Sequence, residues 1–428
     1  MSEVTVTIDS LSYGGAGVAR TERGVVFVSG TAPGDVARVR IIADKRDYRE
    51  AELLEIVEPA ASRRDPPCRY VPECGGCSWQ HVDYPAQLAA KETILREALA
   101  RIAGLDPASV DVRPILASPE WAYRHRITLR VDGEQRLGFY RHRSHRLIEI
   151  DSCLIADDTV NTHLATAREW LRGVSTTIRR LEIASASGGR AIFVAIAEGP
   201  FRHDGEYHEK FLRTHPALRG IVLTGKGWRR AFGKPTASIP VAEDLEIESD
   251  GGFTQVNPTA NLLLTETVLE LAMPRADDRA LDLYCGAGNF TLPIARRVRA
   301  VVGVETDVAS VGCARRNADR AGLANCRFVQ QTAAAAAKGL AAEGERFSIV
   351  ILDPPRSGAA DVVESLPPLE PSRVVYVSCN PTTLARDLKQ LVSLGFDIGP
   401  LQPIDLFPQT YHLEVVARLD RRRGREAD

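Results

Sequence analysis

The order of hydrophobic and polar residues divides the chain into three stretches of different character. From the N-terminus to residue 58, apolar and polar residues alternate with the period of a β-strand, most clearly at residues 4–8 and 36–42. Glycine-containing turns at residues 14–17 and 33–35 separate these runs. Short strands punctuated in this way predict a small β-barrel over residues 1–58.

The middle stretch, residues 59–250, is predicted to be a β-rich domain. It begins with a linker at residues 59–67, which is rich in proline and charged residues. Strand-like runs follow between residues 181 and 222, the clearest of them at residues 191–196. Residues 91–102 have apolar positions at helical spacing, which predicts an amphipathic helix.

From residue 251 to residue 428, strand-like and helical patterns alternate. Four apolar runs read as buried strands: residues 280–284, 301–305, 347–352 and 374–378. Helices are expected from Phe290, from Asp307 and from Pro381. This alternation is typical of a parallel, doubly wound α/β sheet.

Length and composition agree with several globular domains. A chain of 428 residues is too long for one ordinary core, so two or three domains are expected. Hydrophobic residues at 44% and charged residues at 26% exclude a disordered or collagen-like chain. The apolar runs are shorter than a membrane span, and the first ten residues lack a basic segment followed by an apolar one. We therefore expect a cytoplasmic protein.

Four of the eight cysteines have the pattern of a metal site. Cys68, Cys74 and Cys77 are spaced C-x5-C-x2-C, and Cys153 stands alone further along the chain. Cysteines in a long intracellular chain indicate metal binding or catalysis more often than disulfides. Four thiolates from one tight loop and one distant position suit either a tetrahedral zinc ion or an iron–sulfur cluster. The spacing leaves both metals open.

Basic and aromatic residues are interleaved between Trp121 and Arg146, although the net charge of the chain is only −2. Cations can bind phosphates while aromatic rings stack on bases, the combination that single-stranded RNA requires. The stretch therefore predicts contact with RNA. Its members include Tyr123, Arg124, His125, Arg126, Arg130, Arg136, Phe139, Tyr140, Arg141, Arg143 and His145.

Chemically distinctive residues follow the predicted strands of the last domain, where parallel sheets collect their ligands. The first strand runs into the glycine turn of residues 282–290, and Glu305 ends the second strand. Glycines allow close approach of a ligand, and an acid can accept both hydroxyls of a ribose. The missing third glycine and the position of the acid favour S-adenosylmethionine over NAD. Asp353 lies in a rigid Asp-Pro-Pro-Arg turn, and Cys379 lies before a helix N-terminus that would favour its thiolate.

These motifs resemble those of the RNA uracil-C5 methyltransferase family. The resemblance rests on DLYCGAGNF, DPPR, VSCNP and the terminal His412-Leu413-Glu414, and extends over nearly the whole chain. The GGAGVAR and APGD turns resemble the TRAM domain, an RNA-binding barrel of the OB type. Within the family, the 23S ribosomal RNA enzymes are the most similar. The resemblance implies a TRAM barrel at 1–58, a central domain with a metal cluster at 59–250, and a Rossmann-like class I methyltransferase domain at 251–428.

The resemblance also implies roles for individual residues. Cys379 would be the nucleophile that adds to carbon 6 of uracil, and Glu414 the base that removes the carbon-5 proton, with His412 its nearest competitor. Cys68, Cys74, Cys77 and Cys153 would hold a 4Fe–4S cluster. The S-adenosylmethionine site would be lined by Gln255, Tyr284, Asn289, Glu305 and Asp353.

One position departs from the family pattern, and three further cysteines have no implied role. Where the family often has an Asn or Asp that holds the adenine, this chain has Gln330, Gln331 and Thr332. Cys285, Cys313 and Cys326 are expected to be structural.

Other functions were weighed against this one. The same reaction could act on a transfer RNA uridine. An amino-group methyltransferase would need an aromatic residue where Arg356 stands and would leave Cys379 without a task. A metal-containing RNA-binding protein without catalysis would be expected to lack Cys379 or Glu414, and both are present. We expect RNA as the partner, no membrane, no obligate protein partner and a monomer.

Overall fold

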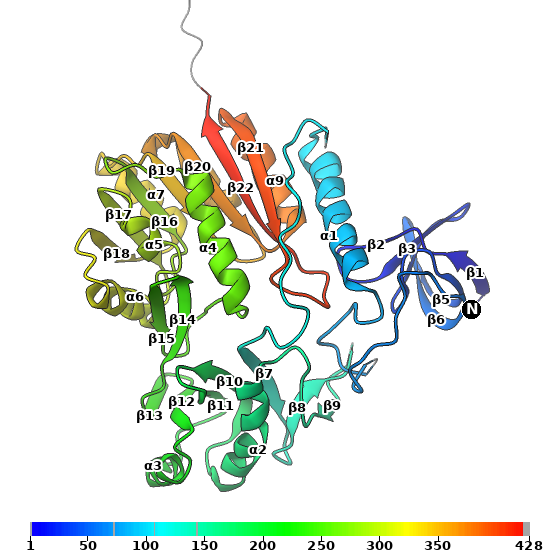
Figure 1. Cartoon of the computed structure of the whole chain (residues 1–428), viewed down its shortest axis with the longest axis horizontal. Coiled ribbons are helices and arrows are strands. Elements are labelled where there is room, and N and C mark those ends of the chain that lie inside the picture. The colour runs from blue at the N-terminus through cyan, green and yellow to red at the C-terminus, as the bar shows by residue number, and fades with distance from the viewer. Residues whose placement is uncertain (1, 72, 107, 143, 423–428) are drawn as a thin grey trace, which may run out of the picture.

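The computed structural model describes residues 2–71, 73–106, 108–142 and 144–422, and these form three sheet-based domains (Figure 1). The N-terminal domain is a six-stranded sheet in the order β1-β5-β6-β4-β3-β2. Alternate residues such as Val26 and Val39 point into its core and are fully buried. Its strands are β1 (Glu3–Thr7), β2 (Ser10–Leu11), β3 (Gly17–Thr21), β4 (Gly24–Val28), β5 (Val36–Asp44) and β6 (Tyr48–Glu58).

The central domain is a seven-stranded sheet in the order β13-β12-β11-β10-β7-β8-β9. Helices α2 (Asp158–Gly173) and α3 (Gly205–Thr214) share one core with it, in which Trp170 packs near Phe193. The expected run at 191–196 is confirmed as part of β11. The strands are β7 (Arg126–Val131), β8 (Leu137–Tyr140), β9 (Leu147–Glu149), β10 (Ile178–Ala186), β11 (Arg190–Ala197), β12 (Leu218–Gly225) and β13 (Trp228–Gly233).

The C-terminal domain contains a second seven-stranded sheet, in the order β18-β17-β16-β19-β20-β22-β21. The expectation of a fully parallel sheet is wrong at one strand, because β22 pairs antiparallel with both of its neighbours. A loop without a helix joins β21 to β22, so the chain turns back directly instead of crossing over. The strands are β16 (Arg279–Leu283), β17 (Ala300–Glu305), β18 (Cys326–Gln330), β19 (Ile349–Leu352), β20 (Arg373–Ser378), β21 (Phe396–Ile404) and β22 (Glu414–Arg421).

Helices cover both faces of this sheet, as the alternating pattern predicts. Leu264 and Ile294 belong to the core on one face, and Ala336 and Leu384 to the core on the other. The helices are α4 (Pro258–Ala272), α5 (Thr291–Ala295), α6 (Val308–Arg320), α7 (Ala333–Ala342), α8 (Ala360–Val363), the 3-10 turn η2 (Pro367–Leu369) and α9 (Pro381–Ser393).

Two pieces of the segment 59–250 pack with the C-terminal sheet instead of the central one. Helix α1 (Tyr84–Ala98) and the π-helical turn η1 (Leu99–Ala103) place Leu95 and Leu99 in its core. After them, Val112 pairs with Leu401 of β21. The hairpin β14 (Ala237–Ala242) and β15 (Leu245–Ser249) packs on α6.

The first helix starts earlier than the hydrophobic pattern predicts. Asp83 caps it by accepting the backbone N–H of Ala86 at 2.8 Å. Its first turns bury the polar side chains of Gln87 and Lys91, so they carry no hydrophobic signal.

Within the described ranges, no helix is long and apolar enough to cross a membrane. The cytoplasmic location stays a prediction.

Candidate active site

The turns at the carboxyl ends of β19 and β20 are joined by hydrogen bonds to the backbone carbonyl of Arg356. Asn380 caps α9 by accepting the backbone N–H of Thr382 at 3.0 Å. Its amide donates to the backbone carbonyl of Arg356 at 3.0 Å. Cys379, just before the cap, is therefore fixed beside the Asp-Pro-Pro-Arg turn that carries Asp353.

Glu414 lies next to this thiol as the first residue of the adjacent strand β22, and its side chain is buried. Burial, followed by the neighbouring Asp353, raises the pKa of Glu414 well above its usual range. Burial, Glu414 and Asp353 together raise the pKa of Cys379 to about 12, and only Arg356 among the nearby side chains lowers it. The expectation of a ready thiolate is therefore wrong for the free protein, because burial and two carboxyl groups outweigh the helix N-terminus.

His412 lies beside the Asp-Pro-Pro-Arg turn. Its Nε2 is 3.2 Å from the Arg356 guanidinium, which can only donate, so this nitrogen accepts. Burial and then Arg356 lower the pKa of His412 to about 4, which keeps the imidazole neutral. The rings of Phe407 and Tyr411 lie 5.8 Å and 4.3 Å from the His412 ring. With its Nε2 engaged, His412 forms part of an aromatic wall.

The barrel contributes Tyr13, a residue that the sequence did not single out, to the surroundings of Cys379. Tyr13 donates its hydroxyl to the backbone carbonyl of Cys379 at 3.4 Å. Its ring meets the Tyr411 ring edge to face at 5.3 Å. Burial, followed by the nearby Cys379, raises the pKa of Tyr13 to about 12. The only sequence signal was an aromatic residue directly before a glycine turn.

The glycine turn after β16 lies against the end of β17. Tyr284, Gly286 and Gly288 all have positive φ, at 72°, 54° and 102°, so the turn curls tightly. Glu305 accepts the Gly286 N–H at 3.2 Å, which holds its carboxylate against the turn. Asn289 exchanges two hydrogen bonds with Asn261 of α4, at 2.9 and 3.1 Å.

Two carboxyl groups, those of Asp282 and Asp353, lie at the carboxyl ends of the neighbouring strands β16 and β19. Asp282 is fully buried, and its Oδ1 has no hydrogen-bond partner among the described residues. Burial raises the pKa of Asp282 to about 7, and burial with Asp282 raises that of Asp353 to about 7. A cation bound here would relieve both groups.

Gln255 lies in the connection between β15 and α4. The connection is held by the Arg126 guanidinium, which donates to the Thr254 carbonyl at 2.7 Å. Gln255 is buried, while Phe253 is 67% exposed beneath the Arg126 guanidinium at 5.4 Å. Thr332 caps α7, and the exposed Gln330 and Gln331 precede it.

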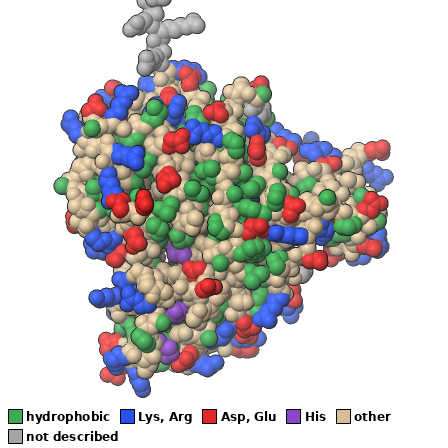
Figure 2. All heavy atoms as spheres, viewed as in Figure 1, with side chains coloured by type: hydrophobic (Ala, Val, Ile, Leu, Met, Phe, Trp, Pro, Cys, Tyr) green, Lys and Arg blue, Asp and Glu red, His purple; other side chains and the backbone are tan. Residues whose placement is uncertain are grey.

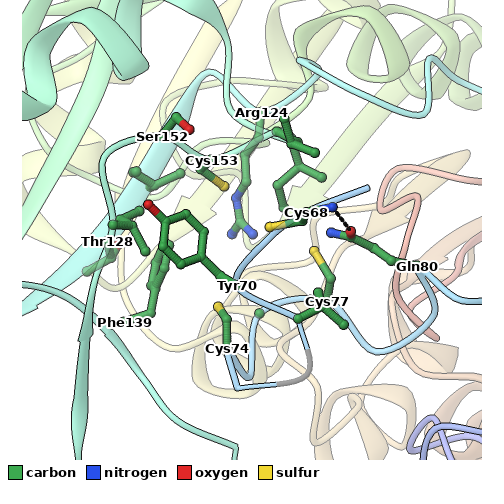
Figure 3. A pocket seen from close by; sticks show the side chains of 16 residues that line it. Cys68, Tyr70, Cys74, Cys77, Gln80, Arg124, Thr128, Phe139, Ser152 and Cys153 are labelled. Atoms are coloured by element: carbon green, nitrogen blue, oxygen red, sulfur yellow. Dashed lines mark hydrogen bonds between the residues drawn. The ribbon is translucent and has the colours of Figure 1, made fainter. Parts of the chain in front are cut away.

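The four grouped cysteines form a separate site, with their sulfur atoms facing one cavity of about 140 Å³ (Figure 3). Burial raises the pKa of Cys74 and Cys153, and that of Cys77 to about 12. No three His, Cys, Asp or Glu side chains in the described ranges are placed to hold a single metal ion. The four half-buried thiols face one common space, and the identity of a group bound there stays a prediction.

Comparisons with known proteins decide the family. The family model described as tRNA (Uracil-5-)-methyltransferase matches residues 244–422, and the TRAM domain model matches residues 1–54. An RNA methyltransferase of Gloeobacter violaceus is 36% identical over 98% of this chain and 96% of its own length. The 23S rRNA (uracil(1939)-C(5))-methyltransferase of Aeromonas hydrophila is 35% identical over 98% and 96%. The chain belongs to the RNA uracil-C5 methyltransferase family.

A solved structure confirms the fold. Pyrococcus abyssi tRNA (uracil-54, C5)-methyltransferase, in complex with S-adenosyl-L-homocysteine, matches 97% of this chain and 100% of its own with a TM-score of 0.73 and 24% identity. The Rossmann-like sheet and the N-terminal TRAM domain are thereby confirmed. As a member of this family, the chain is an S-adenosylmethionine-dependent RNA methyltransferase.

In this methyltransferase, the basic stretch divides into buried and exposed parts. Tyr123 is buried and donates its hydroxyl to the Pro408 carbonyl at 3.0 Å, and His125 is buried as well. Arg141 pairs with Glu73 beside the cysteine loop at 2.5 Å. Arg143 lies outside the described residues.

Arg130, Arg136 and Arg146 of the stretch border a cavity of about 690 Å³ on the central sheet, whereas Arg124 lines the cysteine cavity. The Arg130 guanidinium stacks on the Tyr140 ring at 5.0 Å. Arg179 and Arg180 of β10 join from a part of the sequence that was not predicted, and Asp132 is the acid in the lining. Figure 2 shows basic and acidic side chains intermingled on the face that it presents. The residues lining the cavity include Arg130, Asp132, Arg136, Tyr140, His145, Arg146, Arg179 and Arg180.

Proposed function

We propose that this enzyme transfers a methyl group from S-adenosylmethionine to carbon 5 of a uridine in 23S ribosomal RNA, through a covalent bond between Cys379 and carbon 6. The observation that carries the proposal is the placement of Cys379 between a buried carboxyl on β22, Glu414, and the Asp-Pro-Pro-Arg turn. The relatives named as 23S enzymes, 35–36% identical over nearly the whole chain, support the choice of RNA.

The chemistry explains why a thiol and an acid are needed together. Carbon 5 of uracil is a poor nucleophile until a group adds to carbon 6. The Cys379 thiolate forms a sulfur–carbon 6 bond, and the displaced electron pair makes an enolate that is nucleophilic at carbon 5. S-adenosylmethionine supplies the electrophilic methyl group that carbon 5 then accepts.

Glu414 completes the reaction. Its carboxylate takes the proton from carbon 5, the carbon 5–carbon 6 double bond forms again, and the Cys379 thiolate is expelled. Because the thiol of the free protein has a pKa of about 12, the thiolate forms in the complex with substrates. A cation bound beside Asp353 favours the ionised forms of the neighbouring Cys379 and Glu414.

S-adenosylmethionine is held by the glycine turn, with Tyr284, Asn289 and Glu305 at the turn and Asp353 beside the reacting methyl group. The partnerless Oδ1 of Asp282 and the two raised carboxyl pKa values support a cationic ligand there. Gln255 approaches from the domain connection.

In the same proposal, Cys68, Cys74, Cys77 and Cys153 hold a 4Fe–4S cluster. Their common cavity of about 140 Å³ and the C-x5-C-x2-C spacing support it. Methyl transfer from a sulfonium to an enolate moves no net electrons, so the cluster has a structural role. Anaerobically purified protein should be brown and contain iron with acid-labile sulfide, and one equivalent of zinc without sulfide would contradict this.

The RNA partner is bound by several surfaces together. The cavity lined by Arg130 and Arg180 offers phosphate contacts, and the exposed ring of Phe253 offers a stacking face. The target base leaves its stack to reach Cys379. We propose a cytoplasmic monomer that needs no protein partner.

The direct test is methyl transfer from labelled S-adenosylmethionine to unmodified transcripts of 23S ribosomal RNA and transfer RNA. We expect label at carbon 5 of a uridine in 23S RNA, and none in transfer RNA at equal enzyme concentration. Label in transfer RNA alone would overturn the choice of RNA, and label on an amino group would overturn the reaction.

A further inference from the structure

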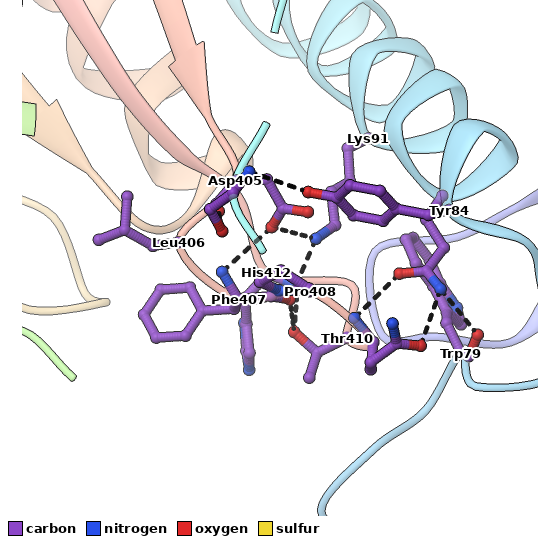
Figure 4. Close-up of polar contacts among 12 residues, drawn as sticks. Trp79, Tyr84, Lys91, Asp405, Leu406, Phe407, Pro408, Thr410 and His412 are labelled. Atoms are coloured by element: carbon purple, nitrogen blue, oxygen red, sulfur yellow. Dashed lines mark hydrogen bonds and ion pairs between the residues drawn. The ribbon is translucent and has the colours of Figure 1, made fainter. Parts of the chain in front are cut away.

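The loop between β21 and β22, residues 405–413, is hydrogen-bonded to the residues that directly follow the cysteine-bearing loop. Figure 4 shows this loop beside Trp79 and α1. The backbone N–H groups of Ser78 and Trp79 both donate to the Gln409 carbonyl at 3.0 Å. Ser78 follows Cys77 in the chain, and Gln409 precedes Glu414 by five positions. Two backbone hydrogen bonds therefore join the cysteine loop directly to the segment that leads to the proposed base.

Gln409 hydrogen-bonds to several distant segments of the chain, which an ordinary loop residue does not. It is fully buried, with a left-handed backbone at φ 68°, a conformation that a non-glycine residue adopts only when its surroundings enforce it. Its Oε1 accepts from Gln87 and from Arg64, both at 3.0 Å. Its Nε2 donates to Glu120 at 3.1 Å, and its backbone N–H donates to Gln87 at 2.9 Å. Four segments of the chain thus hold this one residue.

A buried ion pair fixes the start of the same loop. Lys91 of α1 and Asp405 are both fully buried and lie 2.7 Å apart. Lys91 also donates to the Phe407 carbonyl at 3.1 Å. The loop is therefore anchored at residues 405, 407 and 409, before it reaches Tyr411 and His412.

Ser78 and Trp79, the two residues after Cys77, also contact the barrel. The Trp79 indole donates to the Gly15 carbonyl at 3.0 Å. A side chain at Gly15 would lie 3.0 Å from the Ser78 Cβ and 3.2 Å from the Tyr411 ring, so the three segments touch there. Gly15 follows Tyr13 by two positions, and Tyr13 bonds to Cys379.

We propose that Ser78 and Trp79, together with Gln409, clamp both walls of the uridine pocket, so that the occupied cysteine site positions Tyr13 on one side and Glu414 on the other. The roles of Tyr13 and Glu414 rest on the proposed function. The clamp itself predicts only that two segments, residues 12–18 and 405–414, are less well ordered when the cysteine site is lost. The glycine turn that holds S-adenosylmethionine is built on β16 and β17, outside both segments, and keeps its affinity when the clamp is lost.

The test compares amide hydrogen exchange in four full-length proteins that are purified anaerobically. The cysteine site is occupied in those that keep all four cysteines. They are the wild type, Cys77→Ser, Gln409→Asn, and Gln402→Asn as the matched control. Asparagine tolerates positive φ but is too short to reach the partners of Gln409. Gln402 is also a buried glutamine of the same domain, and it donates to the carbonyls of Pro114 and Pro403.

We expect Cys77→Ser to speed exchange about tenfold or more in both segments, since the hydrogen bonds of a loosened loop open more often. Gln409→Asn should do so in residues 405–414, and Gln402→Asn in neither segment. The affinity for S-adenosylmethionine, measured by calorimetry, should stay within about twofold of the wild type in all three variants. The reason is that the cofactor site lies on elements outside both segments. For Gln409→Asn, kcat should fall while KM for S-adenosylmethionine does not change.

Unchanged exchange in both segments of Cys77→Ser would overturn the clamp, as would an equal rise over the whole chain together with lost cofactor affinity. If Cys77→Ser does not fold, Trp79→Phe, which removes only the indole N–H to Gly15, replaces it and should speed exchange in residues 12–18. Hydrogen exchange and cofactor affinity, the two readouts that decide the clamp, do not require uridine chemistry. A wild type that methylates no uridine would therefore refute the function and leave the clamp to its own result.

Discussion

Tyr13 in the barrel donates a hydrogen bond to the backbone carbonyl of Cys379, which lies 366 positions later in the chain, at 3.4 Å. An RNA-binding module is thereby in contact with the proposed nucleophile. The Tyr13 ring also packs edge to face on Tyr411, so one barrel residue borders two sides of the pocket. RNA binding by the barrel and reaction at Cys379 are expected to be linked through this residue.

Tyr13→Phe should therefore lower kcat/KM for RNA by about 2- to 10-fold, the effect of losing one hydrogen bond worth about 0.5–1.5 kcal/mol. The affinity for S-adenosylmethionine should not change. The control is Tyr48→Phe, a barrel tyrosine whose ring packs on Phe27 at 5.6 Å instead. Equal kcat/KM values for the two variants would contradict the link.

S-adenosylmethionine should bind more tightly as the pH rises from about 6 to about 8. Burial and Asp282 raise the pKa of Asp353 to about 7, so below that pH the carboxyl is neutral and above it is an anion. The cofactor's sulfonium is a cation, so it favours the ionised form and its binding releases a proton. Calorimetry in buffers of different ionisation enthalpy measures that proton. Asp353→Asn should flatten the pH profile, and a flat profile in the wild type would contradict the assignment.

Lys91→Met should lower the free energy of unfolding by about 3–5 kcal/mol, because it leaves the fully buried Asp405 without its cation. The double variant Lys91→Met/Asp405→Asn removes both charges and keeps an acceptor for the Phe407 N–H, so it should recover most of the loss. Denaturant unfolding measures both. A loss below about 1 kcal/mol in the single variant would place this pair among the weak surface pairs.

Arg146→Ala/Arg180→Ala should weaken RNA binding and flatten its salt dependence. Each phosphate contact to single-stranded RNA contributes about 0.7 to the slope of log affinity against log salt, so the slope should fall by about 1.4. Lys210→Ala/Arg213→Ala on α3 is the control with the same change of charge. Equal slopes for the two double variants would show that the arginine-lined cavity on the central sheet is not an RNA surface.

The strands around the site could be predicted because their signal is local. Residues 374–377 are all fully buried, so a continuous apolar run marks β20, and Pro381 marks the helix after it. The caps Asn380 and Asp307 likewise lie at the chain position that they stabilise. Order along the chain was therefore sufficient for the elements that bring Cys379 and Glu305 to the sheet edge.

What could not be predicted depends on contacts between distant segments. Gln87 and Lys91 are buried polar residues whose partners, Gln409 and Asp405, lie 322 and 314 positions away. The pKa of Cys379 depends on Glu414 from a strand that turns back antiparallel, a reversal that the hydrophobic pattern does not encode. The contact of Tyr13 with Cys379 likewise joins residues that lie 366 positions apart in the chain.

The division of labour between Cys379 and Glu414 is the centre of this account, and a denaturing gel with RNA and methyl-labelled S-adenosylmethionine tests it most directly. Glu414→Gln keeps size and hydrogen bonding but cannot take the carbon-5 proton, so a methylated protein–RNA adduct should accumulate and carry the label. Cys379→Ala should bind RNA and cofactor and form neither adduct nor product. Normal turnover by Glu414→Gln, together with a trapped adduct in His412→Ala, would contradict the account and give the base to His412.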